Sequence, residues 1–363
     1  MRLNRLKAPT WNRLQINDIT IEEDITINSS GRCAIEKVPS GLIIGNESCA
    51  DCNGCPAIVR EEIGAIKGGM GQEADVFFEK ASPEILMVRA REGRNIPEPL
   101  NIRYLMEKGD SNADRVEIIA EEGSSLTVIM DYTSSSSTAS GFFGIQTRIS
   151  VKKGASVHLV KVNLLGRQYL CLDDTCVRVE EGGSFDITQM LLGGGRSIAG
   201  LGVDLSGRRA SFNGDTAYLC LGDQMLDMNC HIDHHGKGTV SELKVSGALR
   251  DKASKTFRGT IDLIRGAKGA SGAEQEDVLL LSDDVINKTL PVILCDEDDV
   301  EGAHGATIGR LSPETLFYMQ SRGISEREAE LIMTKAKLNA VRHLIGDEYV
   351  NGRIQYYLEE VFG

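Results

Sequence analysis

The segment Lys153-Gly154-Ala155-Ser156-Val157-His158-Leu159 places a charged residue, a glycine and a small residue before a run in which apolar side chains alternate. Two other segments, 122–128 and 181–187, show the same order of residue types. Their glycines, at 123, 154 and 182, are separated by 31 residues (123 to 154) and 28 residues (154 to 182). Repeats of this length bury their inner faces only against their neighbours, so the sequence predicts a mainly β fold of the parallel β-helix or a similar stacked-sheet type.

The composition supports this prediction. The 363 residues include 39 glycines and only 5% aromatic residues, which favours short strands and tight turns over a helical bundle. The formal charge of −13 and the absence of a long basic cluster argue against nucleic acid as a main partner. No apolar run approaches the roughly 20 residues that cross a bilayer, and the first residues lack the apolar core of a signal peptide. We therefore expect a cytoplasmic protein.

The hydrophobic period changes from that of strands to that of helices between Cys295 and Gly323. His304 lies in this junction among glycines and alanines, which leaves its imidazole accessible. The sequence therefore predicts three parts: an N-terminal segment at 1–100 with a cysteine loop, a β-helix core at 101–300 and a C-terminal helical domain at 301–363.

Three helices are expected in the last part. The first begins at Ser312, an N-cap residue followed by proline, and ends at Gly323. The second begins with a capping box formed by Ser325 and Glu328, and the third begins near position 347. Four large side chains, at 316–319, surround the first helix, so one side can pack inward while another offers a helix-in-groove contact to a partner.

Nine cysteines in a chain without a secretion signal are better interpreted as thiols or metal ligands than as a disulfide framework. Cys49, Cys52 and Cys55 are spaced so that three thiolates converge on one centre, as in loops that hold iron–sulfur clusters. A fourth ligand would come from Cys33, another part of the fold, a second chain or a group other than cysteine. The alternative is a loop with inert thiols. The nearby glycine-rich segment 68–71 is expected to be a linker or flexible loop.

A second metal site is conceivable in the segment 227–235. On an extended strand His231, Asp233 and His235 point to one face and His234 to the other. Two imidazoles and a carboxylate suit zinc or iron, which gives the alternative function of a metal-dependent enzyme on a β-helix with a bound water as nucleophile. The other interpretation is a solvated polar ladder between turns.

The chain resembles the SufB/SufD family, the scaffold subunits of the SUF iron–sulfur cluster assembly machinery. The resemblance covers roughly residues 100–363, with support upstream from His234-His235, Phe257-Arg258-Gly259 and Leu279-Leu280-Leu281-Ser282. The family's C-terminal signature is found in Pro291, Asp298-Asp299-Val300, His304-Gly305-Ala306-Thr307-Ile308-Gly309, Leu316-Phe317-Tyr318 and Ser321-Arg322-Gly323-Ile324.

This resemblance implies a right-handed parallel β-helix flanked by a helical domain. It also implies a non-enzymatic scaffold that assembles and passes on an iron–sulfur cluster, paired with a second copy or a paralogue. A separate ABC-type ATPase, a sulfur donor and recipient apoproteins are the further partners implied. The family's ATPase-docking region falls on the helix that carries Leu316, Phe317, Tyr318, Arg322 and Gly323. A third hypothesis is that the chain is a purely structural or regulatory partner of the ATPase and that its cysteines have no function.

The family's cluster ligands gather near the position of His304. This chain departs from both branches there, because Gly302 replaces the cysteine of the SufD-like branch and Gly305 the glutamate of the SufB-like branch. When the SufB-like branch is aligned on this histidine without gaps, its cluster-building cysteine falls near Glu276. Cys295 matches a different cysteine of that branch, nine residues before the histidine. The expected metal ligands are therefore His304 with Cys295 or Glu276, and separately the loop of Cys49, Cys52 and Cys55. The cluster type, and whether the pair is a homodimer or a heterodimer, are left open.

Overall fold

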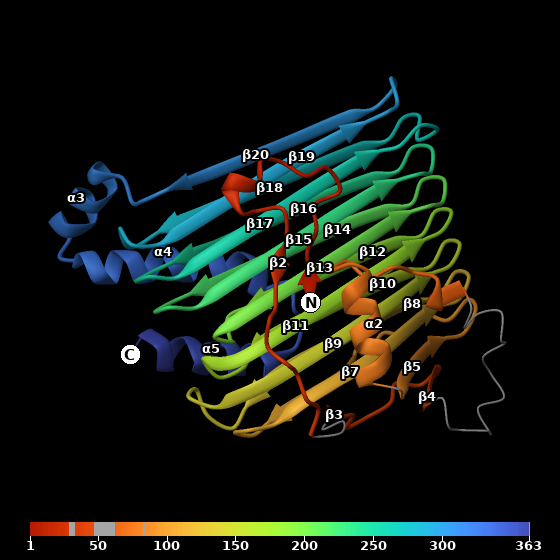
Figure 1. Cartoon of the computed structure of the whole chain (residues 1–363), viewed down its shortest axis with the longest axis horizontal. Helices are drawn as coiled ribbons and strands as arrows, with labels where there is room; N and C mark the ends of the chain where they lie inside the picture. The colour runs from red at the N-terminus through yellow and green to blue at the C-terminus, as the bar shows by residue number, and fades with distance from the viewer. Residues whose placement is uncertain (29–32, 47–61, 83, 363) are drawn as a thin grey trace.

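The computed structural model describes residues 1–28, 33–46, 62–82 and 84–362. Two nine-stranded sheets form a parallel β-solenoid of about eight turns (Figure 1). One sheet has the order β20-β18-β16-β14-β12-β10-β8-β6-β3 and the other the order β19-β17-β15-β13-β11-β9-β7-β5-β4. Successive strands thus alternate between the sheets, and pairing is parallel except where β3 and β4 begin the sheets. The predicted β-helix with C-terminal helices is confirmed.

The strands of the first sheet are β3 (Cys33–Ala34), β6 (Leu100–Met106), β8 (Ser125–Ser134), β10 (Ser156–Leu164), β12 (Ser184–Leu191), β14 (Ser211–Cys220), β16 (Val240–Leu249), β18 (Ser271–Leu280) and β20 (Glu301–Gly309). Those of the second are β4 (Leu42–Asn46), β5 (Ile85–Ala90), β7 (Ser111–Ala120), β9 (Ser140–Val151), β11 (Gln168–Val179), β13 (Arg196–Leu205), β15 (Met225–His234), β17 (Ser254–Leu263) and β19 (Ile286–Cys295).

The glycine repeat corresponds to the turns that precede β8, β10 and β12. Gly123, Gly154 and Gly182 have φ angles of 65°, 63° and 64°, in the left-handed region that glycine adopts most readily. The residues that follow are in register, since Ser125 pairs with Ser156 and Ser156 with Ser184. The sequence spacing of the glycines therefore equals one turn of the solenoid.

The core lies between the two sheets and consists of columns of apolar side chains. Val128, Leu159 and Ile187 occupy equivalent positions on three neighbouring strands and are fully buried. Each such side chain contributes roughly 1.5–3 kcal/mol relative to an exposed one. Because each turn covers only its neighbours, the first and last turns lack this cover on one side.

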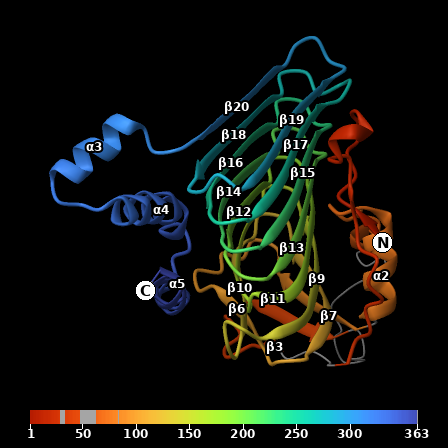
Figure 2. The same cartoon turned by 60° about the vertical axis from the view of Figure 1, so that its left-hand side comes forward.

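The C-terminal helices are α3 (Pro313–Ser321), α4 (Glu326–Arg342) and α5 (Glu348–Phe362). Helices α4 and α5 cover the outer face of the β20-containing sheet, whereas α3 lies away from it and buries no residue (Figure 2). Ser312 caps α3 through the Thr315 amide, and Ser325 and Glu328 form the capping box of α4, so both predicted helix starts are confirmed. The solenoid itself continues through β20 to residue 309, and the division of the chain into domains stays a prediction.

The N-terminal segment covers the other sheet, on the opposite side of the solenoid (Figure 2). It contains β1 (Arg2–Leu3), η1 (Asn12–Leu14), β2 (Ile19–Thr20) and α2 (Gln72–Ala81). Asn4 donates a hydrogen bond to Asp227 on β15 at 2.7 Å. Asp227 also accepts two bonds from Arg258 on β17, at 2.7 and 3.0 Å.

The expectation of a linker or flexible loop at 68–71 is wrong. Gly69 lies so close to β13 that a Cβ there would be 2.6 Å from the Leu201 nitrogen. The Gly69 carbonyl accepts from Asn229, and the Met70 amide donates to Asp174 at 2.8 Å. These glycines therefore allow close packing of backbone on a sheet.

Candidate functional site

The residues with metal-binding chemistry near the C-terminal end of the solenoid lie on β18, β19 and β20. Among the described strands, β19 and β20 each have a neighbour within their sheet on one side only, so both sheets end with an unpaired edge. All of β20 up to Ile308 is exposed. Unpaired N–H and C=O groups in such a row are available to a partner strand.

His304 is on β20, in register with Glu274 of β18. Since paired residues of parallel strands share a face, and Glu274 is buried inside the solenoid, His304 continues this inward-facing column at the open end. Its imidazole is exposed, and a Cβ built on the neighbouring Gly305 would meet nothing within 4 Å. The structure therefore bears out the accessibility expected from the small flanking residues.

Cys295 ends β19 and is the exposed member of the six cysteines that the structure describes. Its thiol donates to the Glu297 carbonyl at 3.2 Å. Of the others, Cys220 is enclosed in the core, and burial raises its pKa to about 12. Burial also raises the pKa of Cys171 and Cys230 well above the usual value. The buried thiols are therefore held neutral, and Cys295 is the one best placed to meet an incoming metal.

Glu276 lies inside the solenoid and is already engaged. One carboxylate oxygen pairs with Lys255 of β17, and the other accepts from the Thr289 hydroxyl of β19 at 2.6 Å. Lys255 also donates to Thr289 at 3.1 Å. To bind a metal, Glu276 would have to leave a buried ion pair, which is costly because the lysine would remain buried without its partner.

Sequence reasoning missed Glu274, which lies on β18 two residues before the predicted ligand Glu276. Burial, and then the nearby Glu276 carboxylate, raise the pKa of Glu274 to about 7. Gly259 on β17 makes room for it, since a Cβ there would lie 1.9 Å from a Glu274 oxygen. The sequence did contain a signal for Glu274. Glu274 and Glu276 are two residues apart and so share the face of the strand that should be apolar if it points inward.

A short acidic segment, 296–299, connects β19 and β20 beside Cys295. The Gly266 amide donates to Glu297 at 2.9 Å, and this hydrogen bond is the main reason that the pKa of Glu297 is lowered. The carboxylates therefore place negative charge next to the exposed thiol, where it attracts cations.

The metal ligands expected from the sequence, His304 with Cys295 or Glu276, stay a prediction. Among the described residues, no group of three histidine, cysteine, aspartate or glutamate side chains is arranged to hold a metal ion. Cys295, His304 and Glu276 are thus no complete ligand set by themselves. Cys49, Cys52 and Cys55 lie outside the described residues.

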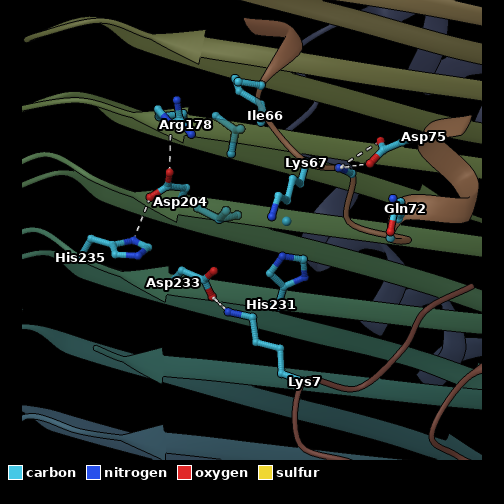
Figure 3. A pocket seen from close by; sticks show the side chains of 16 residues that line it. Lys7, Ile66, Lys67, Gln72, Asp75, Arg178, Asp204, His231, Asp233 and His235 are labelled. Atoms are coloured by element: carbon cyan, nitrogen blue, oxygen red, sulfur yellow. Dashed lines mark hydrogen bonds and ion pairs between the residues drawn. The ribbon is translucent and has the colours of Figure 1, made fainter. Parts of the chain in front are cut away.

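The alternative metal site on β15 does not form either. His231, Asp233 and His235 do line one cleft on the outside, as expected from strand alternation (Figure 3). However, Asp233 pairs with Lys7 at 2.5 Å, and His235 with Asp204 at 3.0 Å. Two of the three supposed ligands are therefore occupied, and the expectation that they converge on a metal is wrong for the described structure.

His234 points into the solenoid instead. It is fully buried between the hydroxyls of Thr239 and Ser241, at 2.8 and 2.9 Å. Burial lowers the pKa of His234 to about 4, so the imidazole is neutral at physiological pH. Its role is to satisfy buried polar groups.

The helix α3 carries the residues expected to contact an ATPase. Phe317 and Tyr318 are 73% and 59% exposed, whereas Leu316 and Met319 are half-buried. Arg322 lies over the Tyr318 ring, 5.3 Å from its centroid. Two large aromatic side chains thus face solvent on one short helix, which is unusual unless they meet a partner.

Comparison with known proteins gives a consistent result. The family described as "SUF system FeS cluster assembly, SufBD core domain" matches residues 104–337. The chain is 28% identical to the iron-sulfur cluster assembly protein SufD of Bacillus subtilis over 237 residues, which are 65% of this chain and 54% of the relative. It is 24% identical to SufD of Escherichia coli over 288 residues, 76% of this chain and 67% of the relative.

A third relative is "Protein ABCI7, chloroplastic" of Arabidopsis thaliana, 23% identical over 302 residues, 79% of this chain and 62% of the relative. The chain thus spans about half to two thirds of the length of these relatives. None of the helices in the described part of the chain is long and apolar enough to cross a membrane.

Proposed function

Because this chain belongs to the SufBD family, we propose that it is a scaffold subunit on which an iron–sulfur cluster is assembled and from which the cluster is transferred. In this proposal the chain catalyses no reaction of its own, and a separate ABC-type ATPase supplies the energy. The observation that carries the proposal is the position of His304 and Cys295, both exposed, at the open end of the solenoid.

We propose that the assembly site is completed by a second scaffold subunit, either another copy or a paralogue. One chain offers an imidazole and a thiol, which are soft ligands suited to iron, but no third ligand joins them among the described residues. Pairing the edges of β19 and β20 with a second subunit would satisfy their backbone groups and bring two copies of 295–305 together.

Within this site Cys295 is the better-placed companion of His304. Its thiol is exposed and its one hydrogen bond is to a carbonyl, whereas Glu276 is held by Lys255 and Thr289. The acidic segment 296–299 would draw iron toward the thiol. Glu276 joins the site only if cluster assembly opens its ion pair.

The loop of Cys49, Cys52 and Cys55 is proposed as a separate ligand set. This proposal rests on sequence spacing, since thiolates three residues apart can reach one iron without long-range folding.

The ATPase is proposed to dock on α3 and the turn after it, at Leu316, Phe317, Tyr318, Arg322 and Gly323. Support comes from the exposure of the two aromatic rings and from the position of helix α3, which lies away from the solenoid in Figures 1 and 2. Exposed aromatic side chains are common anchors of protein interfaces.

The proposal is tested by anaerobic co-expression of the chain with its cognate ATPase, followed by measurement of iron, sulfide and the mass of the complex. A scaffold gives iron and sulfide in comparable amounts, a visible charge-transfer spectrum and a complex with two scaffold subunits. Zinc without sulfide, or no complex with the ATPase, would contradict it.

A further inference from the structure

A cleft of about 760 Å³ lies on the outer face of the second sheet, between the segment 65–75 and strands β11, β13 and β15 (Figure 3). The N-terminal segment closes it from another side through Lys7. Its size is in the range of small-molecule sites. It is separate from the exposed end of the solenoid that carries His304 and Cys295.

Glycines shape the floor and wall of this cleft. Gly69 rests on the β13 backbone, and this close approach holds the wall against the sheet. Gly202 on β13 leaves room for His231, because a Cβ there would lie 3.0 Å from the His231 Nε2 atom. The imidazole therefore lies over the strand and faces the opening.

The carboxylates that line the cleft already have partners. Asp233 accepts from Lys7 at 2.5 Å. Asp204 accepts from Arg178 at 3.0 Å, and its other oxygen lies 3.0 Å from His235 Nδ1. These acidic groups are thus neutralised by neighbouring basic groups of the same wall.

Asp75, the remaining carboxylate, is the most heavily engaged. It accepts from the Gly68 amide at 3.2 Å, from Gln146 at 2.9 Å and from Arg148 at 3.3 Å. Since no carboxylate of the lining is left without a partner, the cleft offers little to a cation.

The groups that remain are hydrogen-bond donors. Lys67 has no hydrogen bond or ion pair with any residue that the structure describes, and the same holds for the His231 ring nitrogens. Figure 3 shows these two side chains pointing toward one another across the middle of the cleft. Gly71 and Gln72, at the N-terminus of the ten-residue helix α2, also line it, and the N-cap Gly71 provides no side-chain cap.

We propose that this cleft binds a small phosphate-bearing molecule, held between Lys67 and His231 and near the N-terminus of α2. A lysine supplies a point charge to phosphate, and a helix N-terminus adds a favourable dipole, although the Gly71 amide itself donates to the Gly68 carbonyl at 3.2 Å. The cleft exceeds what a lone phosphate needs, so the ligand is a phosphorylated metabolite. The inference does not rest on the proposed scaffold function.

The test uses the isolated full-length chain and pyrophosphate as the probe, by isothermal titration at constant ionic strength. The unmodified chain should bind pyrophosphate, and Lys67→Ala should weaken binding by about tenfold or more, the loss expected for a hydrogen bond to a charged group. Lys67→Arg should retain most of the affinity. Lys108→Ala, at an exposed lysine outside the cleft, should leave the affinity unchanged.

A second measurement locates the ligand. The Cε1–H resonance of His231, assigned with His231→Asn, should shift when pyrophosphate is added, while that of the exposed His343 should not. The proposal is overturned if the unmodified chain does not bind pyrophosphate, if Lys67→Ala and Lys108→Ala have equal effects, or if the His231 resonance does not move.

Discussion

Protonation of the buried His234 should make the protein less stable in acid. The Thr239 hydroxyl donates its hydrogen to the Gly236 carbonyl at 3.1 Å, so it must accept from the His234 Nδ1–H. The Ser241 hydroxyl then donates to Nε2, and the neutral ring is fully satisfied. Adding a proton would place a charge in the core without a carboxylate in hydrogen-bond contact.

The size of the effect follows from the two pKa values. Burial lowers the folded-state pKa of His234 from 6.5 to about 4, so the unfolded chain binds a proton first as the pH falls. The stability contributed by the neutral ring is present above pH 6.5 and is lost between there and about pH 4. Between about pH 7.5 and pH 5 the loss is about 2 kcal/mol.

The assay is urea unfolding of the isolated chain at both pH values, followed by circular dichroism. Other groups also titrate in this range. The informative quantity is therefore the change in the free energy of unfolding between the two pH values, compared between His234→Asn and the unmodified chain. The variant should be less stable at neutral pH but lose about 2 kcal/mol less on acidification. The control His343→Asn alters an exposed imidazole at the end of α4 and should retain the full pH dependence. Equal pH dependence in His234→Asn and the unmodified chain would refute the reasoning.

Three further predictions concern partners and ligands. Phe317→Ala and Tyr318→Ala, made separately, should leave the circular dichroism spectrum unchanged. Each should weaken binding to the ATPase by about 2 kcal/mol or more, so that less ATPase co-purifies with the chain. Co-purification of the usual amount of ATPase with both variants would contradict docking on α3. Replacing Cys49, Cys52 and Cys55 with serine should remove most iron from the anaerobically purified isolated chain, and an unchanged iron content would rule out that loop as a ligand set. Sedimentation of the isolated chain at tens of micromolar should show a dimer. If the chain is strictly monomeric and the cell contains no paralogue to pair with it, pairing of the sheet edges is contradicted.

The solenoid could be predicted from the sequence because its signal is local and repeated. The turn glycines at 123, 154 and 182 need a left-handed backbone, and the distance between them is the length of one turn. The starts of α3 and α4 were predictable for the same reason, since the side chains of Ser312 and Ser325 bond to amides three residues away.

Features that depend on distant partners could not be predicted in this way. The 68–71 segment resembles a linker in sequence, and its contact is with β13, more than a hundred residues later. Glu276 resembles an available ligand until the fold places β18 opposite β17, a strand of the other sheet, and so brings it beside Lys255. His231 and His235 share a face as predicted, but their neighbours Lys7 and Asp204 come from other parts of the chain.

The most direct test of the scaffold proposal is the effect of His304→Ala on cluster formation in the anaerobic complex with the ATPase. The matched control is His343→Ala, at an exposed histidine that follows the last residue of α4. We predict that His304→Ala abolishes the build-up of iron and sulfide in the complex while the complex still forms, and that His343→Ala behaves as the unmodified chain. Normal iron and sulfide content in the His304→Ala complex would contradict an assembly site at the open end of the solenoid.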